Sequence, residues 1–393
     1  LDAAELLPAS QSEVGRIQKY IALAYAAKIK LYQAYQQDET THAVTSINKE
    51  LLREVVSLCD QVTASNRYGL LDDFQGLDLV ANENGKESVF AIQYSMNDGT
   101  ESAGRINWSN LLNSPGGGSP YGGDGFFLPS QDLINAYQTD ANGLPDFNYQ
   151  SKSDYSWAVL NNGVYTLQNT TPNVDPRLDF VVGRPTITWK TYPDKPCEGW
   201  VRDKETYGYN CAKRFWVSPE SSDMFNGWPW GASQLNWQII RYADILLWKA
   251  EALIELNEGD GLETARDLIN QIRNRARNSA YVKDFNDHSK YAANYLVNPY
   301  PADVWNQDYA RQALRWETRL EKALEGERFF DLVRWGIVET TMNKYITAES
   351  DNRIYYANAH FTGGKDEYYP VPNNQYGFSG GKYVQNPGYA PFN

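Results

Sequence analysis

"RYADILLWKAEALIEL", residues 241–256, is the stretch on which the interpretation of the whole chain depends. It is mostly apolar and fits a helix, yet Asp244, Trp248 and Glu251 fall at i, i+4 and i+7, which places them on one face. Two carboxylates that flank a tryptophan are typical of the acid/base pair of a glycosidase or of part of a metal site. They are equally typical of charged anchors between packed helices, so the choice decides whether the chain is an enzyme.

The spacing of the two carboxylates favours anchors. At a rise of about 1.5 Å per residue, positions 244 and 251 lie about 10.5 Å apart along the helix. Glycosidase carboxylates lie about 5–5.5 Å or 6.5–9.5 Å apart and face one sugar ring, whereas here Trp248 stands between them. Because buried charges are normally paired, we expect Glu251 to pair with Arg273 or Arg275 of the following helix. A similar pair is expected for Asp244.

Helical periodicity continues on both sides of this stretch and groups into pairs. The expected helices span 13–35 and 46–65, then 238–256 and 262–278, then 307–325 and 327–346, the last two separated at Gly326. The first two begin roughly 33 residues apart, close to the ~34-residue period of a tetratricopeptide helix pair. We therefore expect a mainly α fold in which tetratricopeptide-like helical pairs, at 13–65 and 238–346, form the scaffold.

The region between the first and second pairs, 66–237, has little helical period. A strand is expected at 87–95, where apolar and polar residues alternate, and a loop at 113–126, where glycine and proline are abundant. A short helix capped by Ser130 is expected at 127–138. The scaffold therefore carries a large irregular, loop-rich region with short strands and helices, and long ordered loops of this kind are usually functional.

Charge and composition exclude several classes of partner and chemistry. The formal net charge is −13 and the pI about 4.8, so we expect no nucleic acid and no anionic lipid headgroup as partner, because both require a positive field. The sequence has no run of 18 apolar residues that would span a bilayer. Three His and three Cys provide little material for a metal centre or a Ser–His–Asp triad, so no metal and no cofactor are expected.

The cysteines divide into one isolated residue and one pair. Cys59 falls on the apolar stripe of the helix expected at 46–65, which indicates a buried, inert thiol. Cys197 and Cys211 lie in one loop-like stretch, and a disulfide that closes this loop is expected if the compartment is oxidising. No His or further Cys lies near them in the sequence, which argues against a zinc site.

Several stretches occur together in the order found in SusD/RagB-type proteins, which the chain resembles over nearly its whole length. They include "RYADILLWKAEALIEL", "LINQIRNRAR" (268–277), "LRWETRLEKALEGERFFDLVRWG" (314–336) and "YYPVPNNQ" (368–375), preceded by "GRIQKYIALAYAAKIKLYQ" (15–33), "NRYGLLDDF" (66–74), "ESVFAIQY" (87–94) and "DPRLDF" (175–180). Each motif is weak alone, but their combination is specific. The resemblance implies that the family's N-terminal portion, with its lipid-carrying cysteine and about one helical pair, is missing from this sequence.

The resemblance implies a function as well as a fold. SusD-like proteins are lipoproteins on the outer face of the outer membrane of Bacteroidetes-type bacteria, anchored through an N-terminal lipid. They bind glycans, or peptides in the RagB branch, and sit as a lid on a SusC-like TonB-dependent barrel without hydrolytic activity. We therefore expect one SusD-like domain over 1–393, with the ligand-binding region at 66–237 and an irregular tail at 347–393.

Aromatic residues on the loops are the candidates for ligand contact. The chain holds 12 Trp and 28 Tyr, many in stretches rich in Gly, Pro and Asn, and sugar C–H faces stack well on such rings. The predicted platforms and polar partners are Trp108, Trp157, Trp189, Trp200, Trp228, Trp230, Tyr155, Asn161 and Asn226, with Asp154, Asn162 and Arg202 also available. Core packing is an equally good interpretation of any single Trp.

Three hypotheses compete with glycan uptake. A RagB-like protein would bind peptides instead, and a pure interaction scaffold would bury the loop tryptophans as core. A glycoside hydrolase would need an acidic pair at its active site, which the helix spacing disfavours. Acrylamide quenching of Trp fluorescence separates the scaffold from the binding proteins, because a scaffold exposes few tryptophans.

Overall fold

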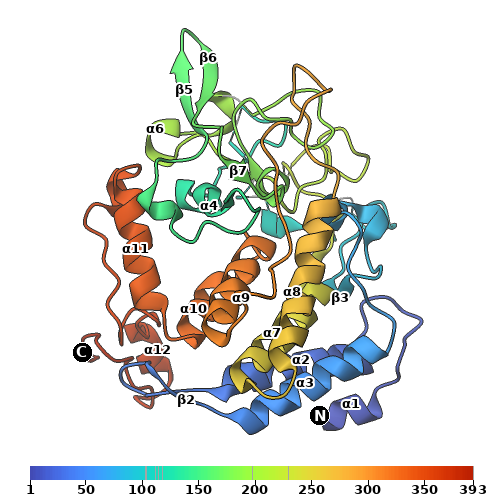
Figure 1. The fold of residues 1–393 in the computed structure, drawn as a ribbon, viewed down its shortest axis with the longest axis vertical. Helices are drawn as coiled ribbons and strands as arrows, with labels where there is room; N and C mark the ends of the chain where they lie inside the picture. Colours follow the sequence, from blue (N-terminus) through green and yellow to red (C-terminus); the bar gives the residue numbers. More distant parts are fainter. Residues whose placement is uncertain are drawn as a thin grey trace.

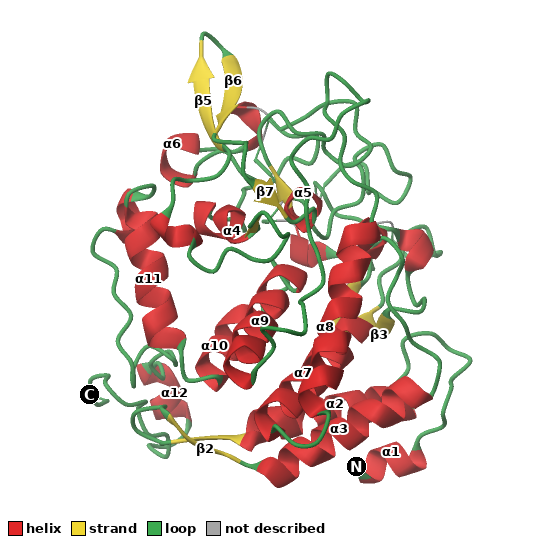
Figure 2. Cartoon of the chain, viewed as in Figure 1, coloured by secondary structure: helices red, strands yellow, loops and turns green. Residues whose placement is uncertain are grey.

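The computed structural model describes residues 1–101, 104–110, 112–113, 115–116, 118–196, 198–228 and 230–392. Long helices gather in the lower part of the view in Figures 1 and 2, and loops with short strands fill the upper part. The expectation of a mainly α scaffold that carries a large loop-rich region is confirmed. No helix in the described part of the chain is both long enough and apolar enough to cross a bilayer.

The scaffold is a stack of helices in which chain neighbours pack together. Its helices are α2 (Lys19–Ala34), α3 (Lys49–Ala64), α7 (Tyr242–Leu256), α8 (Gly261–Asn278) and α9 (Gln307–Glu321). α2 packs on α3, α3 on α7, and α7 on both α8 and α9. Their buried apolar faces form one continuous core, in which α7 is buried on almost every side. This explains why the stretch 242–256 is so apolar: it is the central helix of the stack.

The sequence signals of α3 show how a scaffold helix forms. The Asn48 side-chain oxygen accepts hydrogen bonds from the N–H groups of Glu50 and Leu51, at 3.0 and 3.2 Å, and so caps the helix start. The apolar stripe turns inward and includes Cys59, whose thiol pKa burial raises to about 12. The expected burial of this thiol is thereby confirmed. Small buried residues of α2, such as Ala24 and Ala27, let the two helices approach closely.

Several of the expected helix boundaries are wrong. The helix expected from 13 begins at Lys19, and the helix expected to end at 325 ends at Glu321. The helix expected from 238 begins at Tyr242, because β10 (Trp237–Arg241) pairs antiparallel with β3 (Ser88–Ile92), the strand expected at 87–95. The single helix expected at 327–346 is divided into α10 (Arg328–Arg334) and α11 (Val338–Ser350). Gly336 separates them with a φ of +66°, a left-handed conformation that glycine adopts without steric cost. The break expected at Gly326, with a φ of +86°, is confirmed.

The remaining elements are short. The further helices are α1 (Asp2–Leu6), α4 (Gln131–Ala136), α5 (Arg177–Val181), α6 (Lys204–Tyr207) and α12 (Asn373–Phe378). The further strands are β1 (Tyr35–Gln37), β2 (Val44–Ile47), β4 (Gln138–Thr139), β5 (Trp157–Asn161), β6 (Val164–Gln168), β7 (Asn173–Val174), β8 (Val182–Gly183) and β9 (Cys211–Ala212), which pair antiparallel as β1–β2, β4–β7, β5–β6 and β8–β9. Ser130 caps α4 as expected, accepting from the Leu133 N–H at 3.2 Å.

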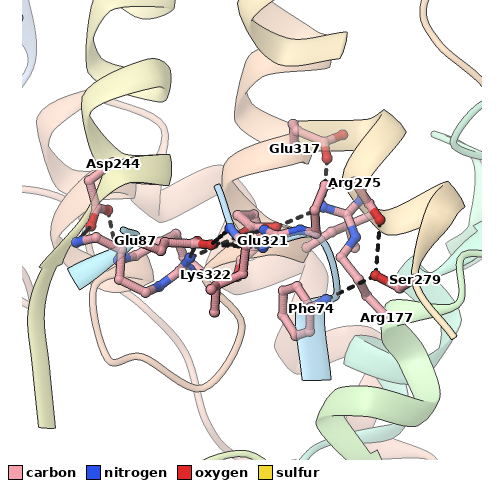
Figure 3. A network of polar contacts seen from close by, with 12 residues as sticks. Phe74, Glu87, Arg177, Asp244, Arg275, Ser279, Glu317, Glu321 and Lys322 are labelled. Atoms are coloured by element: carbon pink, nitrogen blue, oxygen red, sulfur yellow. Dashed lines mark hydrogen bonds and ion pairs between the residues drawn. The ribbon is translucent and has the colours of Figure 1, made fainter. Parts of the chain in front are cut away.

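A network of buried ion pairs joins the loop-rich region to the scaffold (Figure 3). Arg241, at the start of α7, contacts Glu87 at 2.8 Å and Glu321 of α9 at 3.0 Å. Arg275 of α8 reaches the same two carboxylates. Although burial opposes it, these two arginines lower the pKa of Glu321 to about 2, so this carboxylate stays ionised. Arg177 of α5 joins the cluster at 3.2 Å from Glu321.

The two carboxylates of α7 are anchors, as expected, but one expected partner is wrong. Glu251 pairs with Arg334 of α10, and its Oε1 also accepts from the Tyr35 hydroxyl at 2.6 Å and from the Trp335 indole N–H at 2.9 Å. The arginines at 273 and 275 turn instead toward α9 and Glu87. A helix presents different neighbours on different faces, and sequence spacing does not show which neighbour lies where.

Asp244 makes the similar pair that was expected. Its Oδ1 lies 2.7 Å from the ammonium group of Lys322, and its Oδ2 accepts from the Arg241 N–H at 2.7 Å. Both this carboxylate and that of Glu251 are buried, and their known partners surround them. An acid/base pair that faces one sugar ring is therefore not formed by these two residues.

Candidate ligand-binding site

A buried aromatic cluster lies under the loops of the upper region. The Trp189 indole N–H donates to the Tyr121 hydroxyl at 2.9 Å, and this hydroxyl donates to the Val217 carbonyl oxygen at 2.6 Å. The ring of Trp189 lies 5.1 Å from that of Trp200, and the ring of Tyr121 lies 5.5 Å from that of Trp216. Such tilted ring pairs pack densely, so the cluster forms a local core for an otherwise irregular region.

Three predicted platforms lie inside this region rather than on its surface. Trp189 and Trp200 belong to the buried aromatic cluster, and Tyr155 is fully buried in the neighbouring core beside the guanidinium group of Arg184. A ring without an exposed face cannot stack on a sugar, so the prediction is wrong for these three residues. Local composition placed them on loops correctly, but large rings on loops are also what fills a loop region's own core.

Two loops meet above the buried aromatic cluster. The first, 104–128, contributes Tyr121 to the cluster, and the second, 221–236, contributes Met224 and Leu235. The Asn107 N–H donates to the Ser233 carbonyl oxygen at 2.9 Å, which fixes the two loops to each other. A second contact lies further along: a Cβ on Gly122 would stand 3.1 Å from the Cβ of Trp230. Residues far apart in the sequence therefore share one surface.

That surface presents several large rings to solvent. Trp228 is 64 % exposed, Trp230 50 % and Trp108 45 %, and Phe126 at the end of the first loop is also exposed. We call these four residues the loop aromatic surface. Large exposed rings on loops that contact each other are candidates for ligand contact. Sequence patterns predict the three tryptophans but not Phe126, although the position of Phe126 in a glycine-rich loop is a usable signal.

Polar groups lie on these two loops and beside them. Asn226 is exposed in the turn that carries the two tryptophans of the second loop. The Arg202 guanidinium pairs with Asp124 of the first loop and donates to the Gly123 carbonyl oxygen at 3.1 Å. Beside the second loop, burial raises the pKa of the Glu83 carboxyl to about 7. Amide, guanidinium and carboxyl groups of this kind form directional hydrogen bonds to the hydroxyl groups of a ligand.

Trp157 and Asn161 lie apart from the loop aromatic surface, on the β5–β6 hairpin that projects from the upper end of the molecule (Figure 1). Trp157 pairs with Gln168 across the hairpin and is 45 % exposed. Asn161 is exposed beside the two-residue turn, in which Asn162 and Gly163 both have positive φ. Asp154 is engaged internally, accepting from the Asn135 amide at 2.7 Å.

The expected disulfide stays a prediction. Cys211 is buried in β9 beside the buried aromatic cluster. Its expected partner, Cys197, lies outside the described residues.

The helical stack and the exposed rings above it define a class of protein: a ligand-binding protein built on tetratricopeptide-like helical pairs. The particular family follows from the sequence. This chain belongs to the SusD family, whose sequence model matches residues 86–389. A comparison with curated protein sequences found no match.

Solved structures share the fold at low sequence identity. A SusD superfamily protein from Bacteroides vulgatus is 23 % identical with a TM-score of 0.60, the match covering 95 % of this chain and 63 % of that protein. Surface glycan-binding protein A from Bacteroides fluxus is 19 % identical with a TM-score of 0.62, covering 98 % and 67 %. A laminarin-binding SusD-like protein is 20 % identical with a TM-score of 0.52, covering 99 % and 67 %. The chain thus spans about two thirds of the length of these relatives.

Proposed function

We propose that this chain binds glycan chains at the cell surface and passes them to a SusC-like TonB-dependent transporter. The observation that carries the proposal is the loop aromatic surface, where exposed tryptophans stand on loops that a buried aromatic cluster supports. Sugar rings stack their C–H faces on such side chains. Asn226 of the second loop supplies an amide, and Arg202, which contacts Gly123 and Asp124 of the first loop, supplies a guanidinium group.

The names of relatives support a glycan as the ligand. One structural neighbour is called a surface glycan-binding protein and another a laminarin-binding protein. Membership of the SusD family supports the location and partner that we propose, namely the outer face of the outer membrane, an N-terminal lipid anchor and the TonB-dependent barrel. We propose binding without catalysis, in a single domain over residues 1–393 whose ligand site lies within 66–237.

The β5–β6 hairpin extends the proposed site. Trp157 and Asn161 offer one exposed ring and one exposed amide on an element separate from the two loops. We propose that a long glycan contacts both the hairpin and the loop aromatic surface, whereas a short one contacts only the loops. Shortening the ligand therefore removes any effect of Trp157→Ala before it removes the effect of Trp228→Ala.

Affinity electrophoresis against a panel of soluble polysaccharides tests the proposal. The protein is expected to be retarded in gels that contain its glycan, and the double variant Trp228→Ala/Trp230→Ala is expected to regain free mobility. Tyr383→Ala, an exposed ring in the tail outside this site, is the matched control and should be retarded like the parent protein. Absence of retardation by every glycan, with binding of peptides instead, would favour the RagB-like function.

A further inference from the structure

A cavity lies in the scaffold, away from the loop aromatic surface. It has a volume of about 830 Å³ and opens between the end of α2, the helix α10 and the tail from Asp366 to Tyr389. The tail and α12 lie at the end of the molecule opposite to the β5–β6 hairpin (Figure 1). Sites for small ligands have volumes of about 300–1,000 Å³, so this cavity, which we call the tyrosine cleft, is large enough for a ligand.

The tyrosine cleft is lined mainly by aromatic side chains. Of its thirteen described lining residues, eight are Tyr or Phe, and only Val333 is aliphatic. The remaining four are Gln37, Arg334, Asp366 and Glu367, whose amide, guanidinium and carboxylate groups are all planar. Grooves that accept amphipathic helices or acyl chains are lined mainly by flexible aliphatic residues, which this cleft lacks. Flat rings combined with planar polar groups suit a ring-shaped ligand that carries hydroxyl groups.

The charges of the tyrosine cleft restrict the ligand further. The Arg334 guanidinium is already engaged by Glu251 and by Asp331, the latter at 2.9 Å. It also lies over the rings of Tyr32 and Tyr35, at 4.9 and 5.2 Å from their centroids. This guanidinium therefore lines the base of the cleft, and the carboxylates of Glu251 and Asp331 neutralise its charge.

The walls of the cleft add negative charge. Asp366 and Glu367 both line it, and Lys365, 3.6 Å from Asp366, offsets part of this charge. Since like charges repel across a partly desolvated contact, a sugar that carries carboxylates is disfavoured. A neutral sugar is favoured, because its hydroxyl groups can donate to these carboxylates.

We propose that the tyrosine cleft is a second binding site, specific for a neutral glycan. The choice of glycan as ligand class rests on the proposed function, whereas the existence and neutrality of the site rest on the lining of the cleft. Phe330 and Tyr369 stand at its entrance, 59 % and 91 % exposed, and offer rings to the part of the ligand that first enters. The protein then holds two glycan segments at opposite ends of one scaffold.

Calorimetric titration with a short neutral oligosaccharide, too short to bridge both sites, tests this inference. The parent protein is expected to bind two equivalents. The cleft variant Phe330→Ala/Tyr369→Ala and the loop variant Trp228→Ala/Trp230→Ala are each expected to bind one, with at least about tenfold weaker affinity at the altered site. Tyr383→Ala should bind two equivalents. All substituted side chains are exposed, so thermal unfolding should confirm that every variant is folded.

The outcomes separate this inference from the proposed function. A cleft variant that still binds two equivalents, or a loop variant that binds none, overturns the second site and leaves the loop site standing. If the loop variant keeps all binding while the cleft variant loses binding, the loop site is overturned and the tyrosine cleft stands. Replacing the neutral oligosaccharide with one of equal length that contains uronic acids should leave the cleft empty; equal affinity for both overturns the assigned neutrality.

Discussion

Glu251 shows how a single side chain acts in this protein. Its carboxylate accepts hydrogen bonds from Tyr35 of β1 and Trp335 and pairs with Arg334 of α10, so it joins both β1 and the end of α10 to α7. None of its partners is exposed. A charge in such surroundings is strongly destabilising when its partner is removed, because the remaining charge stays buried.

Glu251→Gln is therefore expected to lower the free energy of unfolding by about 3 kcal/mol. The substitution keeps the size of the side chain and removes its charge, which leaves Arg334 with Asp331 alone. Urea denaturation measures the change through the midpoint at constant m-value. The control is Glu258→Gln, whose pair with Arg53 is solvent-exposed and should contribute little. Equal losses for the two variants would contradict the anchoring role.

Lys213 gives a second prediction at this scale, on pH. Its ammonium group is buried without a carboxylate at hydrogen-bonding distance among the described residues, and it donates to the carbonyl oxygens of Asp179 and Thr188, at 2.6 and 2.9 Å. Burial lowers the pKa of Lys213 to about 7. In the unfolded chain the pKa is about 10.4, so between these values the unfolded state binds more protons. The free energy of unfolding attributable to this group therefore rises as the pH increases from about 7 to about 10.

Lys213→Met should remove this dependence. Denaturation between pH 7 and pH 9 is expected to show a smaller increase in stability with pH in the variant than in the parent. Lys382→Met, at an exposed position in the tail, should leave the slope unchanged. An unchanged slope in Lys213→Met would show that this ammonium group keeps an ordinary pKa in the folded protein.

Sequence patterns predict which residues are buried charges but not which charges meet. The position of Asp244 and Glu251 on an apolar helix predicts that each carboxylate has a basic partner. It does not identify that partner, since Arg334, the partner of Glu251, lies 83 positions away and belongs to another helix. The same limit applies to the rings. Trp189 and Trp228 occupy similar loop-like stretches, but only the packing of distant segments decides that one is buried and the other exposed.

At the scale of elements, two glycines define where α10 begins and ends. Gly326 and Gly336 both have positive φ. A Cβ on Gly326 would meet no atom within 4 Å, whereas on Gly336 it would stand 2.8 Å from the Cγ2 of Val44 in β2. A side chain at 326 would therefore cost only backbone conformational energy, whereas a side chain at 336 would also clash with Val44.

We expect Gly326→Ala to destabilise the protein by about 1 kcal/mol, the cost of placing a side chain in the left-handed region. Gly336→Ala should cost about 1–3 kcal/mol more, because β2 must also move. Thermal or urea unfolding of the two variants measures the difference. Equal losses would mean that the contact with Val44 relaxes without cost.

Helices with a strong apolar periodicity were predictable from the sequence, and the strand β10, which depends on pairing with a distant segment, was not. The helices α2, α3, α7, α8 and α9 follow the apolar periodicity of the chain. Residues 237–241 have the same local character as α7 but are held as a strand by β3, which lies about 150 positions earlier. The loop-rich region itself was predictable from composition, while its internal core, built from Tyr121 and three tryptophans, was not.

At the scale of the whole molecule, the loop-rich region and the scaffold are joined by buried charges. Arg177 of α5 contacts Glu317 of α9 at 2.6 Å, and Arg214 contacts Asp78 at 3.0 Å and Glu325 at 3.5 Å. We therefore expect a single cooperative transition in differential scanning calorimetry, with equal calorimetric and van't Hoff enthalpies. Two separate transitions would mean that the loop-rich region unfolds independently of the helices.

The placement of the aromatic surfaces suggests how the whole molecule works. The helical stack, with its charges paired internally, holds the loop aromatic surface at one end and the tyrosine cleft at the other. We propose that exposed tryptophans of the two loops contact the glycan. Affinity alone does not reveal where a ligand touches the protein.

Hydroxyl-radical footprinting with mass spectrometry, in the presence and absence of a saturating glycan, tests that claim most directly. Oxidation of Trp108, Trp228 and Trp230 is expected to fall several-fold when the glycan binds. The buried Trp189 and Trp200 should be oxidised little in either state. Unchanged oxidation of all three loop tryptophans, while calorimetry shows that the glycan is bound, would mean that the glycan binds elsewhere on the protein.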